Sequence, residues 1–98
     1  MALINIRRSG GKVVYDPPTV KLGKGDFVVW ANQDPEAAHQ PTLQGKPADY
    51  WMTDRLPSFV AGGVAAASPA IILAGAAGSS ITYVDGLDPN AGSGTIQF

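Results

Sequence analysis

The chain has 98 residues, which favours a single domain, residues 1–98, with one continuous hydrophobic core. Charged residues make up 15% of the sequence, and the net charge of −1 argues against nucleic-acid binding and against attraction to a membrane surface. Cysteine is absent, which excludes disulfides, thiolate metal sites and cysteine catalysis.

Short strands are predicted along the first third of the chain. Apolar residues at 3–6 and at 13–15 indicate two strands separated by the turn Ser9-Gly10-Gly11. Asp16-Pro17-Pro18 breaks the second strand, because consecutive prolines cannot donate hydrogen bonds to a sheet. Residues 19–22 then alternate between polar and apolar side chains, as a half-buried strand does.

Residues 26–42 form the stretch around which the chain is organised. Phe27 to Trp30 form an apolar, β-branched and aromatic run that predicts a buried strand. The polar segment Asn32-Gln33-Asp34-Pro35 ends that strand, and His39, the single histidine, follows. A buried strand that leads to a lone imidazole suggests a functional site.

The second half is poor in charge and rich in turns. Residues 45–57 are irregular and contain Tyr50-Trp51-Met52, which either pack on the core or form an exposed partner patch. Residues 56–84 carry no charge, but two prolines and many alanines and glycines argue against a membrane span. We expect a buried strand at 70–73 and further strands at 40–43, 81–84 and 95–98. Seven or eight short strands predict an all-β, Greek-key β-sandwich.

Several motifs resemble those of the cupredoxins, the plastocyanin-like blue-copper family. Residues 18–26, PTVKLGKGD, are similar to the family's lead-in, and residues 28–32, VVWAN, are similar to its V-x-W-x-N strand. His39 then stands where the first copper histidine follows that asparagine. Residues 77–83 and 94–96 resemble the segments before and after the family's ligand loop. The resemblance implies a cupredoxin-like sandwich, and a periplasmic or extracellular location, although no signal peptide precedes the first predicted strand in this sequence.

The resemblance does not extend to the copper ligands. A blue-copper centre needs two histidines and a cysteine thiolate with a weak axial methionine. In the family the second histidine, the cysteine and the methionine lie on the loop that corresponds to residues 84–94, and this loop contains no Cys, His or Met. The sequence therefore argues against a type-1 copper site and blue-copper electron transfer.

Two roles remain open for His39. It is either a structural residue that caps one end of the sandwich through hydrogen bonds to neighbouring loops, or the centre of a divalent metal site, with copper (type 2) or zinc as the first candidates. In the second case the loop residues that would surround the metal are Asp34, Glu36, His39, Asp85, Asp88 and Asn90. No nucleophile motif or phosphate-binding glycine loop is present, so we expect no enzymatic activity.

The sequence leads to a non-catalytic binding or structural module with no cofactor, and a divalent metal-binding protein centred on His39 is the alternative. The expected contact surface comprises the loop ends at residues 32–41 and 85–94, with Asn32, Asp34 and Pro41 in the first, extended by Tyr50, Trp51 and Met52. A protein partner or a second copy of the chain is the expected occupant. The low-charge stretch at 59–78 offers a further surface for self-association.

Overall fold

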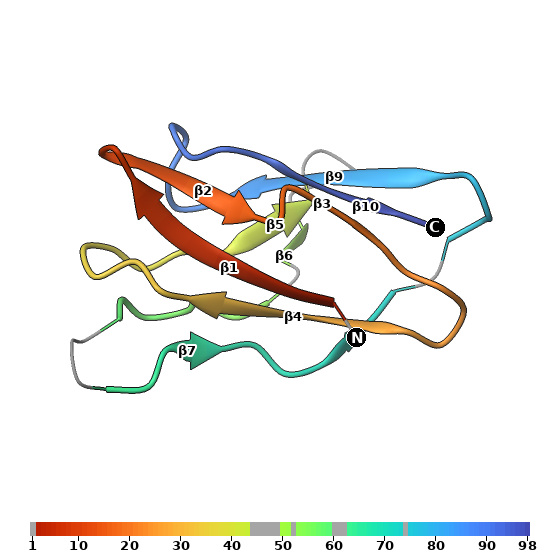
Figure 1. The fold of residues 1–98 in the computed structure, drawn as a ribbon, viewed down its shortest axis with the longest axis horizontal. Helices are drawn as coiled ribbons and strands as arrows, with labels where there is room; N and C mark the ends of the chain where they lie inside the picture. Colours follow the sequence, from red (N-terminus) through yellow and green to blue (C-terminus); the bar gives the residue numbers. More distant parts are fainter. Residues whose placement is uncertain (1, 44–49, 52, 60–62, 74) are drawn as a thin grey trace.

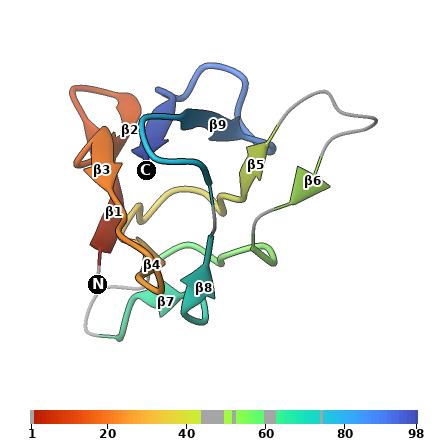
Figure 2. The same cartoon turned by 90° about the vertical axis from the view of Figure 1, so that its right-hand side faces the viewer.

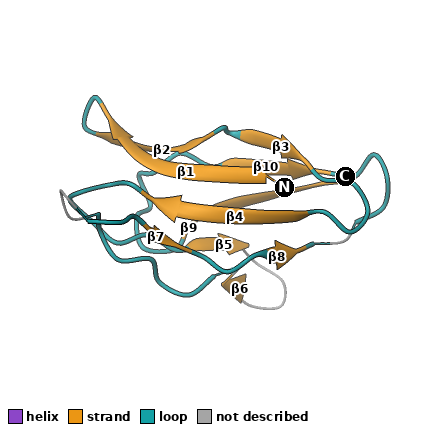
Figure 3. Cartoon of the chain, turned by 60° about the horizontal axis from the view of Figure 1, so that its bottom comes forward, coloured by secondary structure: helices purple, strands orange, loops and turns teal. Residues whose placement is uncertain are grey.

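The computed structural model describes residues 2–43, 50–51, 53–59, 63–73 and 75–98, with only the backbone described at 50 and 51. These residues form strands and loops, and no helix occurs among them (Figure 3). The predicted all-β class is therefore confirmed for the described residues. No helix in this part of the chain is long and apolar enough to cross a membrane. The described residues contain ten strands: β1 Ala2–Ser9, β2 Lys12–Asp16, β3 Thr19–Lys21, β4 Phe27–Asn32, β5 Pro41–Leu43, β6 Tyr50–Trp51, β7 Ala66–Ala67, β8 Ile71–Ile72, β9 Ser80–Asp85 and β10 Gly94–Gln97.

The strands form two mixed sheets (Figure 1). The first has the order β2-β1-β4-β7, with β8 also paired to β4, and the second has the order β3-β10-β9-β5-β6. β1 runs parallel to β4, and β3 runs parallel to β10, whereas the other pairs are antiparallel. Viewed along the long axis of the molecule, the strands of the two sheets surround one interior (Figure 2).

Two local features of the sequence direct this topology. The hairpin between β1 and β2 turns at Gly10 and Gly11, whose φ angles of 58° and 79° are the positive values that a two-residue hairpin loop requires. The break predicted at Asp16-Pro17-Pro18 is the point where the chain leaves the first sheet and enters β3 of the second. The Asp16–Pro17 peptide bond is cis.

Alternating side chains of both sheets form the core. In β1, Ile4 and Ile6 are completely buried while Leu3 is 44% exposed. Tyr83 of β9 lies at the centre, with its ring edge-on to Tyr15 (centroids 5.1 Å apart) and to Trp30 (5.4 Å). The remaining core side chains are Val13, Leu22, Val28, Leu56 and Ile96.

The uncharged stretch at 56–84 differs from the prediction made for it. The expected buried strand at 70–73 is reduced to the two residues of β8, and the side chain of Ile72 is 69% exposed. β7 and β8 each pair with β4 over two residues only, because loop segments interrupt this edge of the sheet. These short pairings also explain why the strands outnumber the seven or eight expected.

Candidate functional site

One end of the sandwich holds a group of buried polar residues on the connection between β4 and β5. Asn32, the last residue of β4, is completely buried. Its side-chain amide donates hydrogen bonds to the carbonyl oxygens of Ala37, Leu56 and Pro57 at 3.0–3.1 Å. Its side-chain oxygen accepts a hydrogen bond from the backbone N–H of Asp34 at 2.9 Å. Asn32 thus fixes the loop that carries the next two polar residues, an arrangement suited to an asparagine side chain.

His39 is completely buried on this connection, and its backbone N–H and carbonyl both pair with Leu56. Its ring nitrogen Nε2 lies 2.6 Å from Oδ2 of Asp34, and Nδ1 contacts Oδ2 of Asp85 at the end of β9. A neutral imidazole can donate only one hydrogen bond, whereas the imidazolium donates two. Because each nitrogen faces a carboxylate oxygen, the geometry matches the protonated ring.

Asp34 is completely buried and also binds Arg8, the penultimate residue of β1. Arg8 Nε donates to Oδ1 of Asp34 at 3.0 Å, and Arg8 Nη2 donates to Oδ2 at 2.8 Å. This bidentate contact is the strongest form of an arginine–carboxylate pair. Arg8 Nε also lies 2.6 Å from Oε2 of Glu36, whose side chain is 65% exposed.

Arg8, Asp34, His39 and Asp85 therefore form one chain of alternating charge, which we call the buried charge network. Two backbone N–H groups complete the hydrogen bonds of Asp85, from Leu87 at 2.9 Å and from Gln40 at 3.3 Å. With His39 protonated, two positive and two negative charges balance, which makes their burial tolerable.

The pKa values of the network follow from this pairing. Burial alone would lower the pKa of His39, but its hydrogen bonds to Asp85 and Asp34 outweigh burial and raise the pKa above its ordinary value. Burial would raise the pKa of Asp34, but hydrogen bonds from Arg8 and His39 bring it down to about 2. Burial would raise the pKa of Asp85, but the hydrogen bonds from His39 and from the backbone of Leu87 and Gln40, together with the charge of His39, lower it.

This arrangement bears directly on whether the residues fit a metal ion. The two carboxylates bind opposite nitrogens of one imidazole, so they do not converge on a shared point beside either nitrogen. Among the described residues no group of three or more His, Cys, Asp or Glu side chains is placed to hold a metal. Metal ligation by His39 would also require loss of a proton that a carboxylate now stabilises.

The structure brings together some of the sequence-predicted site residues and separates others. Asn32, Asp34, His39 and Asp85 meet at one end, and Pro41 pairs with Asp85 across β5 and β9. Glu36 binds Arg8, and not His39. Asp88 accepts a hydrogen bond from the backbone N–H of Asn90 at 2.9 Å, within its own turn. The backbone of Tyr50 and Trp51 forms β6, whereas their side chains and all of Met52 lie outside the described residues.

Arg8 is the network residue that sequence reasoning missed. A signal for it was available, because Ile4, Ile6 and Arg8 occupy alternate positions of one strand and therefore share a face. Its partner could not be read from the sequence, since Asp34 follows β4, which pairs with β1 only in the folded sheet.

Comparison of the chain with protein-family models, with curated proteins and with solved structures finds no match. The site must therefore be interpreted from its own chemistry.

Proposed function

We propose that this protein is a non-catalytic binding or structural module, built on a cupredoxin-like Greek-key sandwich without a type-1 copper site. Three features support the proposal: two mixed sheets, a histidine placed after the asparagine of β4, and contact of that histidine with Asp85, the last residue of β9. The family resemblance assigns the first copper ligand to the position of His39 and the other ligands to the loop at residues 84–94, which contains Asp85. In this protein the residue of that loop that contacts His39 is Asp85, a carboxylate and not a copper ligand of the family.

The observation that carries the proposal is the double hydrogen bonding of His39. A histidine that donates through both ring nitrogens has no free lone pair for a metal and none for accepting a proton. Its side chain is also completely buried, out of reach of a substrate. His39 thus acts as a cross-link between the connection after β4 and the end of β9, which matches the structural role that the sequence left open for it.

The proposed contact surface is the exterior of the loops that this cross-link holds. Asn32, Asp34 and Pro41, which the sequence placed in the contact surface, are buried and lie beneath it. Gln33, Pro35 and Glu36 are exposed on the first loop, and Leu87, on the loop after β9, is 45% exposed. Loops held in place by buried hydrogen bonds lose little conformational freedom when a partner binds, so they are well suited to recognition. The predicted partner is a protein or a second copy of this chain.

The role of His39 is tested by ¹⁵N NMR of its ring at pH 6, combined with thermal melts in Cu²⁺, Zn²⁺, Mn²⁺ and Ca²⁺. We expect both ring nitrogens to be protonated and no ion to raise the melting temperature through His39. Stoichiometric metal binding that raises the melting temperature, and that His39→Gln abolishes, would overturn the proposal in favour of a divalent metal site, because a ligand that prefers the folded state stabilises it.

The contact surface is tested with two matched substitutions. Leu87→Arg places a charge on the proposed surface, and Val64→Arg places the same charge on a side chain that is 96% exposed elsewhere. Self-association or partner capture by the unsubstituted protein should be lost in Leu87→Arg and retained in Val64→Arg. If both variants kept or both lost self-association and partner capture, the loop end would not be the contact surface.

A further inference from the structure

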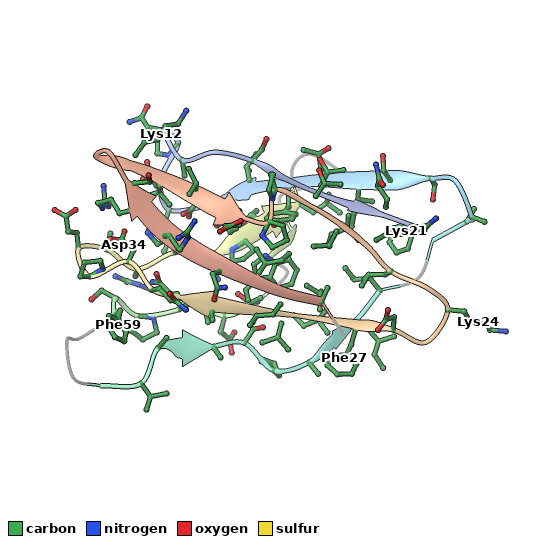
Figure 4. The ribbon with its side chains drawn as sticks, in the orientation of Figure 1. Lys12, Lys21, Lys24, Phe27, Asp34 and Phe59 are labelled. Carbon is green, nitrogen blue, oxygen red and sulfur yellow. The ribbon has the colours of Figure 1, made fainter. Side chains whose placement is uncertain are left out.

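The end of the sandwich opposite the buried charge network contains a half-open cavity of about 630 Å³. Its described walls come from three parts of the chain, namely residues 21–25, residues 72–73 with Gly75, Ala77 and Gly78, and Phe98. Cavities that bind small molecules usually have volumes of about 300–1,000 Å³. Figure 4 shows Lys21 and Lys24 at this end of the molecule, remote from Asp34.

The interior of this cavity is apolar. Leu22 is buried beside it, and Leu73 and Phe98 are half-buried. Ile72 also lines the cavity and remains 69% exposed, a large apolar side chain that no described residue covers. A ligand with an apolar body would remove this surface from water, which is the main favourable term in such binding.

Glycines keep the cavity open and its walls defined. Gly75 lies directly against the ring of Phe98, where an added Cβ would come within 2.4 Å of a ring carbon, so this wall is closely packed. At Gly23, in contrast, an added Cβ would meet no atom within 4 Å. Gly23 also lines the cavity, and a larger side chain can be placed there without a clash at its Cβ.

The charged side chains that line the cavity have one sign. Lys21 and Lys24 line it, and no acidic residue does. Neither lysine forms an ion pair with any described residue. An anionic group on a ligand would find two positive partners here, whereas a cationic group would be repelled.

From these observations we propose that this cavity binds a small amphipathic carboxylate, with its apolar body against Ile72, Leu73 and Phe98 and its carboxylate facing Lys21 and Lys24. Both parts of the ligand are needed. An apolar molecule without the anion would leave the lysines unpartnered, and a small polar anion would leave Ile72 exposed. This site is separate from the loop end proposed above for protein contacts.

The proposal is tested by titrating the full chain with decanoate, held below the concentration at which it forms micelles, and following backbone amide resonances by NMR. We expect saturable shifts that are largest at Gly23, Gly78 and Phe98. Decanol and decylamine have the same ten-carbon chain with a neutral or a positive head group, and they should bind more weakly than decanoate, with decylamine the weakest. Absence of saturable shifts, or equal binding of the three compounds, would overturn the proposal.

Substitutions locate the site. Gly23→Leu should fill the cavity and abolish the shifts. Ile72→Asp should do the same by placing a negative charge at the mouth, and because Ile72 is largely exposed this variant retains the fold. Val64→Asp is the matched control, with the same change on another exposed apolar side chain. Decanoate binding that survives both cavity substitutions would overturn the assignment.

The lysines are tested separately from the apolar wall. Replacing Lys21 or Lys24 with Gln should weaken decanoate binding by up to about fivefold each, the range of a solvent-exposed ion pair. Lys12→Gln, at the other end of the molecule (Figure 4), should leave it unchanged. Decanol binding should not respond to any of these three substitutions. An equal effect of Lys12→Gln would show that decanoate responds only to net charge, and the site would be withdrawn.

Discussion

The two ends of this sandwich reverse the usual distribution of polar and apolar side chains. At one end three charged or polar side chains, Asp34, His39 and Asp85, are almost completely removed from water. At the other end Ile72 is largely exposed beside an open apolar cavity. Soluble proteins normally bury aliphatic residues and leave unpaired charges in solvent.

The two ends also differ in whether their exposed or charged side chains find partners within the chain. The polar end is internally satisfied, because the carboxylates and the imidazole find their hydrogen-bond partners within the chain. The apolar end leaves both its exposed isoleucine and its lysines without partners among the described residues. The polar end, whose side chains are already paired, holds the loops in place. The apolar end, whose side chains lack partners, is where binding of a ligand would release the most free energy.

Breaking the polar end should have the largest effect. Asp34→Ala removes the partner of both Arg8 and His39 and leaves a buried imidazolium half paired, so we expect the free energy of unfolding to fall by about 3–5 kcal/mol. Urea denaturation measures the change. Asp88→Ala is the control. Asp88 accepts a hydrogen bond from the backbone N–H two residues later, as Asp34 does from Glu36, but it lies on an exposed loop. A loss below about 1 kcal/mol for Asp34→Ala would mean that the network contributes little to stability.

A pair of glycine substitutions compares the packed interior with the open end. A Cβ at Gly94 would lie 2.1 Å from the ring of Tyr83, which is held between Tyr15 and Trp30. Gly94→Ala should therefore destabilise the protein by about 1–3 kcal/mol. Gly23→Ala should be neutral or slightly stabilising, because its Cβ meets nothing and the unfolded chain loses freedom. Similar melting temperatures for the two variants would contradict the packing described here.

The pH dependence of stability should also report on the polar end. The pKa of His39 is raised in the folded protein, so its contribution is complete below the ordinary value of 6.5 and disappears as the pH rises through the folded pKa. Asp34 acts in the opposite sense, with a contribution that is complete above 3.8 and lost as the pH falls through about 2. Stability due to the pair is therefore greatest between pH 3.8 and 6.5.

The alkaline limb of this profile identifies His39. Above pH 6.5 the free energy of unfolding should fall by up to about 1.4 kcal/mol per pH unit until the folded pKa is passed. Urea denaturation from pH 5.5 to 9 measures this slope, which His39→Gln should remove. An unchanged slope in the variant would assign the titration to another group.

The smallest effect is expected at the centre of the core. The Tyr83 hydroxyl is buried without a hydrogen-bond partner among the described residues, and burial raises the pKa of this tyrosine to about 12. Tyr83→Phe removes an unpaired polar atom, so stability should stay within about 0.5 kcal/mol of the parent or increase. A loss above about 1 kcal/mol would reveal a partner for this hydroxyl.

Much of the local structure was determined by the sequence alone. Short apolar runs located β1, β2 and β4, and alternation over residues 19–22 located β3, because composition and the period of two residues in a strand are local properties. The prolines at 17 and 18 located the end of β2 for a similar reason, since a proline acts on its own backbone, and the structure places the switch between sheets at this point. The position of His39 after the asparagine of β4 also drew attention to the end of the molecule that holds the buried charge network.

Tertiary structure alone decided which groups meet. His39 and Asp85 are 46 residues apart, and Arg8 and Asp34 are 26 apart, so their contacts depend on strand pairing across and between the sheets. The same pairing removed Glu36 and Asp88 from His39, although their sequence positions placed them in the same loops. It also left Ile72 exposed, because β8 lies at an edge of its sheet and pairs with β4 over only two residues. Hydrophobic pattern is local, whereas burial depends on the neighbours that the fold supplies.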